Sequence, residues 1–378
     1  MPSPELKLLA ACCGPLIQAA PRVADALQAP IDWRLLVDRS NAQGTLPLLS
    51  RVLTTAGTTR VPPEFLAEIH DKAARKTIRG LVMASELAHV MRNFETAGLT
   101  AITFKGPTLA YLAYGDVALR DSADLDIYIP RPQFKTALKL LHSDGYRESS
   151  AAFRTSLAGG CEVALKRQNP ACEIDLHWQF SPPYFLQFDA ARAFRRSVIV
   201  QASGLVARTL CTEDLLIYLS IHAARECWAI RPICDVTALL TNQRIDWDDL
   251  LRETLRSRCW RAVAVGLRLA ANVLDAPVPQ DIRRRVDLDQ NVRAVAGEFA
   301  KYLTGDIADH AGTPGGAMLH LRMLDTRASQ ARYLWRRAVQ PNHLDASFIP
   351  LPNALETAYY VIRPLRVACA ALGLLRVR

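Results

Sequence analysis

The sequence has no uninterrupted apolar run long enough to cross a membrane. A spanning helix needs about 18–20 consecutive apolar residues, and the 378-residue chain contains no such stretch although 50% of its residues are hydrophobic. The first residues, MPSPELKLLAACCGPL, also lack a basic segment followed by a long apolar one. We therefore expect neither a spanning helix nor a secretory signal peptide, and we expect a cytoplasmic protein.

Paired cysteines are missing too. The cysteines form no CxxC pair, and no cysteine–histidine spacing matches a zinc motif. We expect these thiols to be buried or idle in a reducing compartment. The nine cysteines stand at positions 12, 13, 161, 172, 211, 227, 234, 259 and 369.

The charge is strongly one-sided, with a formal net charge of +9. A positive net charge is compatible with an anionic partner such as a nucleotide, a nucleic acid or an acidic membrane surface. The charge alone does not distinguish among these partners. We find no RNA- or DNA-binding motif and no basic–aromatic repeat, which makes a nucleic-acid partner unlikely. The arginine clusters at 283–285 and 336–337 are expected to be solvated helix faces.

The length predicts two or three domains, and the apolar spacing predicts an α/β plus α protein. Residues 1–85 and the chain beyond Pro182-Pro183 carry apolar residues at helical spacing of three and four. We expect a small mixed β-sheet flanked by N- and C-terminal helical regions. The predicted parts are an N-terminal helical region (1–85), a catalytic α/β domain (86–185), a helical domain that closes over the cleft (186–310) and an Arg-rich helical segment (311–378).

The α/β part has a clear order of elements. Residues 99–104 are rich in β-branched side chains and residues 124–129 alternate strictly, so both are predicted to be strands, with a helix over 107–114 between them. A second helix ends at Gly145. The last two strands, 161–167 and 172–180, flank a short turn and predict an antiparallel hairpin.

Acidic side chains gather on two of these strands. Alternate residues of a strand share one face, so Asp124 and Asp126 point together. The same alternation groups Glu173, Asp175 and His177 on the second strand. If the two strands are neighbours, three or four acidic groups lie within a few ångströms of one another.

Clustered carboxylates repel one another and need a counter-charge. A divalent cation with oxygen ligands supplies it, and Mg²⁺ is usually held by a few carboxylates together with substrate phosphates. Two such ions can clamp the attacking and leaving oxygens of a phosphoryl displacement. The pattern therefore predicts a divalent cation such as Mg²⁺ (or Mn²⁺) at this acidic cluster, and transfer chemistry at phosphorus.

With these residues in place, the stretch 98–178 resembles the nucleotidyltransferase superfamily. More closely, it is similar to the bacterial family described only as uncharacterised nucleotidyltransferases. The motifs that carry the resemblance are Phe104-Lys105-Gly106, Arg120, Asp124-Leu125-Asp126-Ile127, Gly145-Tyr146 and Ile174-Asp175-Leu176-His177-Trp178. Weaker matches follow at Ile221-His222, Ile233-Cys234-Asp235, Tyr359-Tyr360 and Arg363-Pro364-Leu365-Arg366.

The resemblance implies roles for the acids. Asp124 and Asp126 would hold the metal and the triphosphate, and Asp175 would help bind the catalytic metal and act as the base. Lys105-Gly106 stands where relatives such as the aminoglycoside nucleotidyltransferases carry Gly-Ser, and eighteen positions separate Gly106 from Asp124. This departure leaves the nucleotide and the leaving group open.

Neighbouring polar residues have two readings each. Lys105 either meets phosphate oxygens or is a surface lysine at a strand end, and Gly106 belongs to the same nucleotide-binding turn. Arg120 either neutralises triphosphate charge or forms a salt bridge with Asp126.

Histidines near the acids are also ambiguous. His177 orients the acceptor or a carboxylate, or makes a structural hydrogen bond. His222 and Asp235 meet over the cleft, or form a buried hydrogen bond between two helices. Glu173 is expected to be solvated.

The C-terminal segment mixes Tyr359, Tyr360 and the apolar run 367–375 with arginines. It is either a helix docked on the protein's own core or an interfacial helix in peripheral contact with an anionic membrane. Pro364 interrupts any long amphipathic face and favours the first.

The sequence as a whole predicts a metal-dependent nucleotidyltransferase. The donor is an NTP, with ATP expected, and pyrophosphate leaves. The acceptor is a hydroxyl or phosphate of a small molecule, a peptide or a protein. The alternatives are a non-catalytic nucleotide-binding or scaffolding module, and a phosphotransferase that uses the same metal site.

Overall fold

The computed structural model describes residues 3–56, 60–149, 161–180, 188–202, 204–225, 229–304, 314–341 and 343–371. It begins with helices, as expected. The long helix α5 starts at Pro63, the predicted position, and the chain turns away at Gly98, whose φ of 69° suits glycine. The N-terminal helices are α1 (Pro4–Cys13), α2 (Ala19–Ala26), α3 (Trp33–Ala42), α4 (Leu46–Thr55) and α5 (Pro63–Thr96).

A mixed five-stranded sheet follows, in the order β1-β2-β5-β4-β3. Only β2 and β5 pair in parallel; the other neighbours are antiparallel, including the predicted hairpin of β4 and β5. The strands are β1 (Ile102–Thr103), β2 (Leu125–Tyr128), β3 (Arg147–Glu148), β4 (Glu162–Gln168) and β5 (Ala171–His177). The predicted helices are α6 (Gly106–Tyr114) and α7 (Phe134–Ser143).

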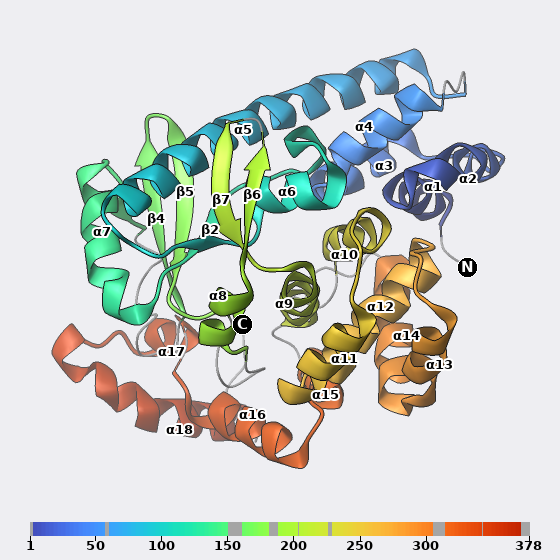
Figure 1. The fold of residues 1–378 in the computed structure, drawn as a ribbon. Coiled ribbons are helices and arrows are strands. Elements are labelled where there is room, and N and C mark those ends of the chain that lie inside the picture. Colours follow the sequence, from blue (N-terminus) through green and yellow to red (C-terminus); the bar gives the residue numbers. More distant parts are fainter. Residues whose placement is uncertain are drawn as a thin grey trace.

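The long helix α5 runs across one face of the sheet (Figure 1). Leu125 and Ile127 of β2 and Ile174 of β5 share a buried apolar cluster with Met83 and Leu87 of α5. Because strand side chains alternate, the residues between these apolar ones face away from α5. The sheet therefore directs its acidic residues to the side that α5 leaves open.

A two-stranded sheet was not predicted. Beyond Pro182-Pro183 we expected only helices, but β6 (Val198–Ala202) and β7 (Leu205–Thr209) form an antiparallel hairpin after the short helix α8 (Ala190–Arg196). Leu205 and Ala207 are buried in the cluster beneath α5. The sequence pattern did not indicate the hairpin because each strand has only five residues. The buried residues of β7 pack against α5, which is distant in the sequence.

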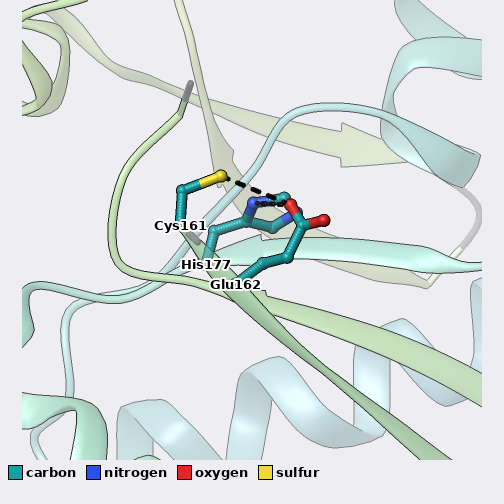
Figure 2. A group of neighbouring side chains, drawn as sticks. All are labelled: Cys161, Glu162 and His177. Atoms are coloured by element: carbon teal, nitrogen blue, oxygen red, sulfur yellow. Dashed lines mark hydrogen bonds and ion pairs between the residues drawn. The ribbon is translucent and has the colours of Figure 1, made fainter. Parts of the chain in front are cut away.

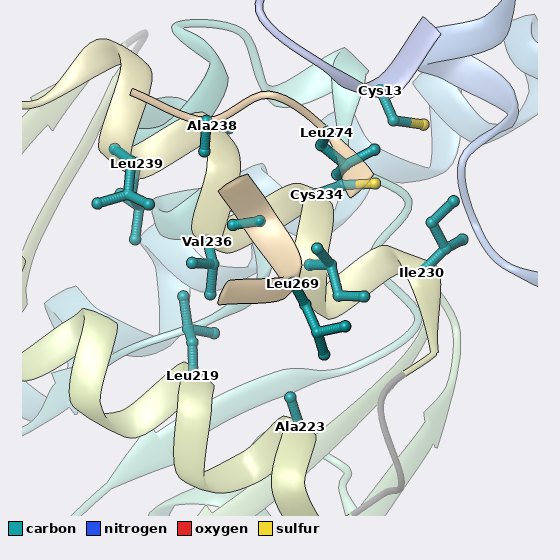
Figure 3. Close-up of a cluster of buried hydrophobic side chains, with 14 of the residues drawn as sticks. Cys13, Leu219, Ala223, Ile230, Cys234, Val236, Ala238, Leu239, Leu269 and Leu274 are labelled. Atoms are coloured by element: carbon teal, nitrogen blue, oxygen red, sulfur yellow. The ribbon is translucent and has the colours of Figure 1, made fainter. Parts of the chain in front are cut away.

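The rest of the described chain is helical, which confirms the α/β plus α fold class. Figure 3 shows Cys13 of α1 and Leu269 of α12 in one apolar cluster with residues of α9 and α10. The N-terminal helices thus share a core with the C-terminal ones, and the boundaries at 85, 185 and 310 stay predictions. The helices are α9 (Thr212–Arg225), α10 (Ile230–Asn242), α11 (Trp247–Arg256), α12 (Trp260–Val273), α13 (Gln280–Leu288), α14 (Gln290–Thr304), α15 (Pro314–Met323), α16 (Arg327–Val339), α17 (His343–Phe348) and α18 (Tyr359–Ala371).

Within the described residues, no helix is long and apolar enough to cross a membrane. Some predictions lie outside the described residues: Pro182-Pro183, Cys227 and the end of the apolar run 367–375.

A buried ion pair ties α5 to the sheet. Glu86 of α5 accepts a hydrogen bond of 2.8 Å from the hydroxyl of Tyr146 and forms an ion pair with Arg167 of β4. The Arg167 guanidinium also lies over the Tyr146 ring, 4.7 Å from its centre. Both charged side chains are largely buried, at 8% and 12% exposure.

Glu86→Ala is expected to lower the free energy of unfolding by about 3–5 kcal/mol, because it leaves the Arg167 charge buried without a partner. Glu95→Ala, at an exposed position of the same helix, should change it by less than about 0.5 kcal/mol. Urea denaturation of the two variants measures the difference. Equal stabilities would contradict the role of this ion pair.

Candidate active site

The acidic site rests on the parallel pair β2 and β5. Their register sets Asp126 beside Asp175 and Tyr128 beside His177. Ligand atoms of Asp126, Asp175 and His177 all lie within 4.8 Å of one another. Asp124 directly precedes β2 and lines the same cavity.

Asp126 is the most enclosed of the acids, with 2% of its side chain exposed. Its Oδ1 accepts a hydrogen bond of 3.0 Å from Nζ of Lys105 and lies 3.3 Å from Nε2 of His177. Its Oδ2 is buried and has no hydrogen-bond partner among the described residues. Burial alone would raise the pKa of Asp126, but Lys105 and His177 hold it far below its usual range.

The other two carboxyls have raised pKa values. Burial raises the pKa of Asp175 to about 7; His177 opposes the rise, while Asp126, Glu162 and Asp124 add to it. Burial and the neighbouring Asp126 raise the pKa of Asp124 as well. Burial and the close acidic neighbours thus disfavour the charged forms of both carboxyls.

His177 bridges two carboxylates. Its Nε2 faces Asp126, and its Nδ1 is 2.9 Å from Oε2 of Glu162 on β4. Burial would lower the pKa of His177, but these acidic neighbours raise it well above its usual value. Burial would raise the pKa of Glu162, but His177 and Arg225 lower it to about 2. The role of orienting a carboxylate, one of the two considered for His177, fits this contact.

Glu162 is a site residue that the sequence analysis missed. The register of the hairpin pairs Glu162 with His177, and facing residues of neighbouring strands project to the same side of a sheet. Counting back across the predicted turn would have found it.

These residues line a cavity of about 350 Å³. The cavity is also lined by Tyr218 and His222 of α9 and by Arg231 of α10. Gln43, from the end of α3, also lines the cavity, and its buried Oε1 has no hydrogen-bond partner among the described residues. The local sequence around Gln43 and Arg231 gave no indication that these residues line the site.

Arg120 lines the same cavity, but it does not form the salt bridge that was one of its two readings. It binds Asp235 rather than Asp126, with Nε 3.0 and 3.1 Å from the two carboxylate oxygens of Asp235. The Tyr114 hydroxyl donates a further hydrogen bond of 2.9 Å to Asp235. Arg120 and Asp235 are 5% and 3% exposed, so this pair fixes α10 against the loop that leads to β2. His222 stacks on the ring of Tyr218, with 5.9 Å between the ring centres.

The Lys105-Gly106 turn begins α6. Gly106 has a φ of 56°, which glycine adopts without strain, and a Cβ there would lie 3.5 Å from the carbonyl oxygen of Asp124. Lys105 projects to Asp126 and to the ring of Tyr218, 5.7 Å from its centre. Glu173, in contrast, forms a partly exposed ion pair with Lys166, as expected for a solvated acid.

The donor set fits a hard divalent cation. Asp124, Asp126 and Asp175 supply carboxylate oxygens, which Mg²⁺ and Mn²⁺ prefer. The unpartnered Oδ2 of Asp126 is a buried acceptor that such an ion would satisfy.

A larger cavity of about 750 Å³ lies beside Tyr128, Trp178 and Phe188. None of the three candidate metal-binding acids lines it. Phe180, which lines the smaller cavity, packs against Phe188 with 5.2 Å between ring centres. The candidate metal-binding acids therefore belong to the smaller cavity.

The raised pKa of Asp175 predicts a pH-dependent stability of the metal-free protein. Its pKa is about 7 in the folded chain and about 3.9 when unfolded, so between these values the folded state binds more protons. The contribution of Asp175 to stability is therefore present at low pH and is lost as the pH rises towards 7.

Asp175→Asn should remove this part of the slope. We expect chelator-treated wild type to lose more stability than the variant between about pH 5 and pH 8, measured by urea denaturation. Parallel pH profiles would show that the Asp175 carboxyl is not perturbed.

A comparison with known protein families agrees with the resemblance noted above. A sequence model of the family described as "Uncharacterised nucleotidyltransferase" matches residues 29–275. Among solved structures, an antigenic nucleotidyltransferase-like protein from Paracoccidioides brasiliensis shares 17% identity, with 52% of this chain and 93% of that chain covered and a TM-score of 0.33. A TM-score at that level carries no argument. No curated protein matches the chain.

Proposed function

Because the chain belongs to the family of uncharacterised nucleotidyltransferases, we propose that it transfers a nucleoside monophosphate from an NTP, with ATP as the expected donor, in a reaction that requires Mg²⁺ or Mn²⁺. The observation that carries the proposal is the buried Asp126, set beside Asp175 by strand pairing and left with one unpartnered oxygen. A protein without metal chemistry has no evident use for three clustered acids.

Asp124 and Asp126 would hold the ion, and Asp175 would complete the site. When bound, the ion would draw charge from the phosphoryl oxygens and orient the triphosphate. Asp175 would accept the proton of the acceptor hydroxyl, as a positioned carboxylate acting as general base. Lys105 and Arg231, which both line the cavity, would bind phosphate oxygens, and Arg120 would position the loop before β2.

The acceptor is a hydroxyl or phosphate of a small molecule, a peptide or a protein. Nucleic acid is disfavoured by the lack of a recognisable binding motif. The cavity wall formed by Gln43, Tyr218 and His222 is the region that would contact the acceptor.

Incubation with α-labelled NTPs and a cell extract tests the proposal. We expect a labelled acceptor and released pyrophosphate. Asp126→Ala should abolish labelling, and Asp175→Asn should lower the rate by about 10²- to 10⁴-fold if it is the base. Glu173→Gln, on the same strand but in a partly exposed ion pair, is the matched control and should remain active.

Other products would favour the alternatives. Release of ADP with a phosphorylated acceptor would identify a phosphotransferase. Nucleotide binding that ignores the metal and is unchanged by Asp126→Ala would identify a non-catalytic nucleotide-binding or scaffolding module.

The C-terminal helices suggest a peripheral contact with an anionic membrane. Leu334 and Trp335 of α16 and Val361 and Leu365 of α18 are 51–70% exposed, and the two helices pack together. We call these four residues the C-terminal apolar surface. Residues 311–378 contain nine arginines, no lysine and three acidic residues, a charge that complements anionic lipid. The opposite side of α18 docks on its neighbours, where Arg363 bonds the carbonyl of Arg337.

Replacing Trp335 and Leu365 together by alanine should reduce co-sedimentation with phosphatidylglycerol vesicles by at least about tenfold, with little binding to phosphatidylcholine in either protein. Leu288→Ala, at an exposed leucine on α13, is the control. Equal binding of all three proteins would rule out this surface.

A further inference from the structure

A second group of candidate metal ligands lies beside the acidic site. Cys161 and Glu162 come from the start of β4, and His177 ends β5 (Figure 2). The hairpin register pairs Glu162 with His177, and the Trp178 N–H bonds the carbonyl of Cys161 at 2.8 Å. The sulfur, carboxylate oxygen and ring nitrogen all lie within 4.8 Å of one another.

We propose that Cys161, Glu162 and His177 bind a zinc ion through Sγ, a carboxylate oxygen and Nδ1. The site goes beyond the proposed function, because it uses none of the three acids assigned to Mg²⁺ and needs no nucleotide. A fourth position would be filled by water or a small ligand, as in zinc sites with three protein ligands.

The separations suit a tetrahedral ion. With usual zinc bond lengths, a sulfur and an oxygen ligand lie about 3.6 Å apart, and a nitrogen and an oxygen ligand about 3.4 Å apart. Sγ of Cys161 is 3.6 Å from Oε2 of Glu162, and Nδ1 of His177 is 2.9 Å from the same oxygen. The sulfur–oxygen separation therefore already matches the expected one, and the nitrogen–oxygen separation is about half an ångström short of it.

The ligand types separate this site from the acidic one. A thiolate and an imidazole favour zinc, whereas carboxylates alone favour Mg²⁺ and Mn²⁺. Nδ1 of His177 is buried and lies 2.9 Å from Oε2 of Glu162, so a metal bound there would replace the proton between these two atoms. Nε2 lies 3.3 Å from Oδ1 of Asp126, and a metal-bound histidine usually has such a carboxylate on its other nitrogen.

Charge and protons also balance. The Cys161 thiolate, Glu162 and Asp126 carry three negative charges, and the zinc ion with Lys105 carries three positive ones. Binding releases the thiol proton of Cys161 and the Nδ1 proton of His177 to solvent, and Nε2–H stays directed at Asp126. The bound ion would hold His177 in one orientation and so fix its contact with Asp126.

Cobalt substitution tests the proposal. Chelator-treated protein titrated with Co²⁺ should bind one equivalent and develop the near-ultraviolet charge-transfer band of a cobalt–thiolate bond, which Zn²⁺ then displaces. Cys161→Ser should lose the band and bind zinc at least about 100-fold more weakly. Cys172→Ser, a buried cysteine on β5 outside the cluster, should keep both.

Two further variants keep the test decisive. Glu162→Gln should retain the thiolate band and weaken zinc binding, which covers the case that Cys161→Ser does not fold. Asp175→Asn should leave the band unchanged, because that carboxylate belongs to the other site. A wild type without the band, or a band that survives in Cys161→Ser, would overturn the proposal. Inactivity towards nucleotides would leave these spectra unaffected.

Discussion

The parallel pairing of β2 with β5 places Asp126 directly beside Asp175. His177 lies two residues further along β5, on the same face of the sheet. Neither strand can shift by one residue without moving its acids to the face covered by α5. Leu125, Ile127 and Ile174 hold the register from beneath, since they are buried in the cluster with α5. The hairpin β6–β7, the ion pair of Glu86 with Arg167 and the long helix itself all serve to keep this sheet face in place.

The same pairing creates an electrostatic problem. Asp124, Asp126 and Asp175 share a cavity with Glu162, and among the described residues Lys105 and His177 make polar contacts with Asp126. Burial and the acidic neighbours raise the pKa of Asp175 to about 7. This carboxyl is therefore partly neutral near neutral pH, which reduces the repulsion among the acids. A bound divalent cation would reverse that shift and allow all three acids to be charged.

Much of this could be predicted from the sequence because it depends on local alternation. The strands around Asp126 and Asp175, the helix after Gly106 and the hairpin were all predicted. The predicted family agrees with the family model that matches residues 29–275. Contacts between residues far apart in the sequence could not be predicted. The partner of Arg120 is Asp235, 115 residues away, and Gln43 reaches the cavity from a helix three elements before the sheet. The cluster of Cys161, Glu162 and His177 escaped the zinc-spacing test because its members meet across a hairpin rather than along a local motif.

The account as a whole depends on Asp126 binding a nucleotide-associated metal ion. Calorimetry of NTP binding with and without Mg²⁺, on wild type and Asp126→Ala, tests this most directly. The account predicts binding by wild type that requires Mg²⁺ and is weakened by at least about 100-fold in the variant. NTP binding of equal strength in all four titrations, or in none of them, would contradict it.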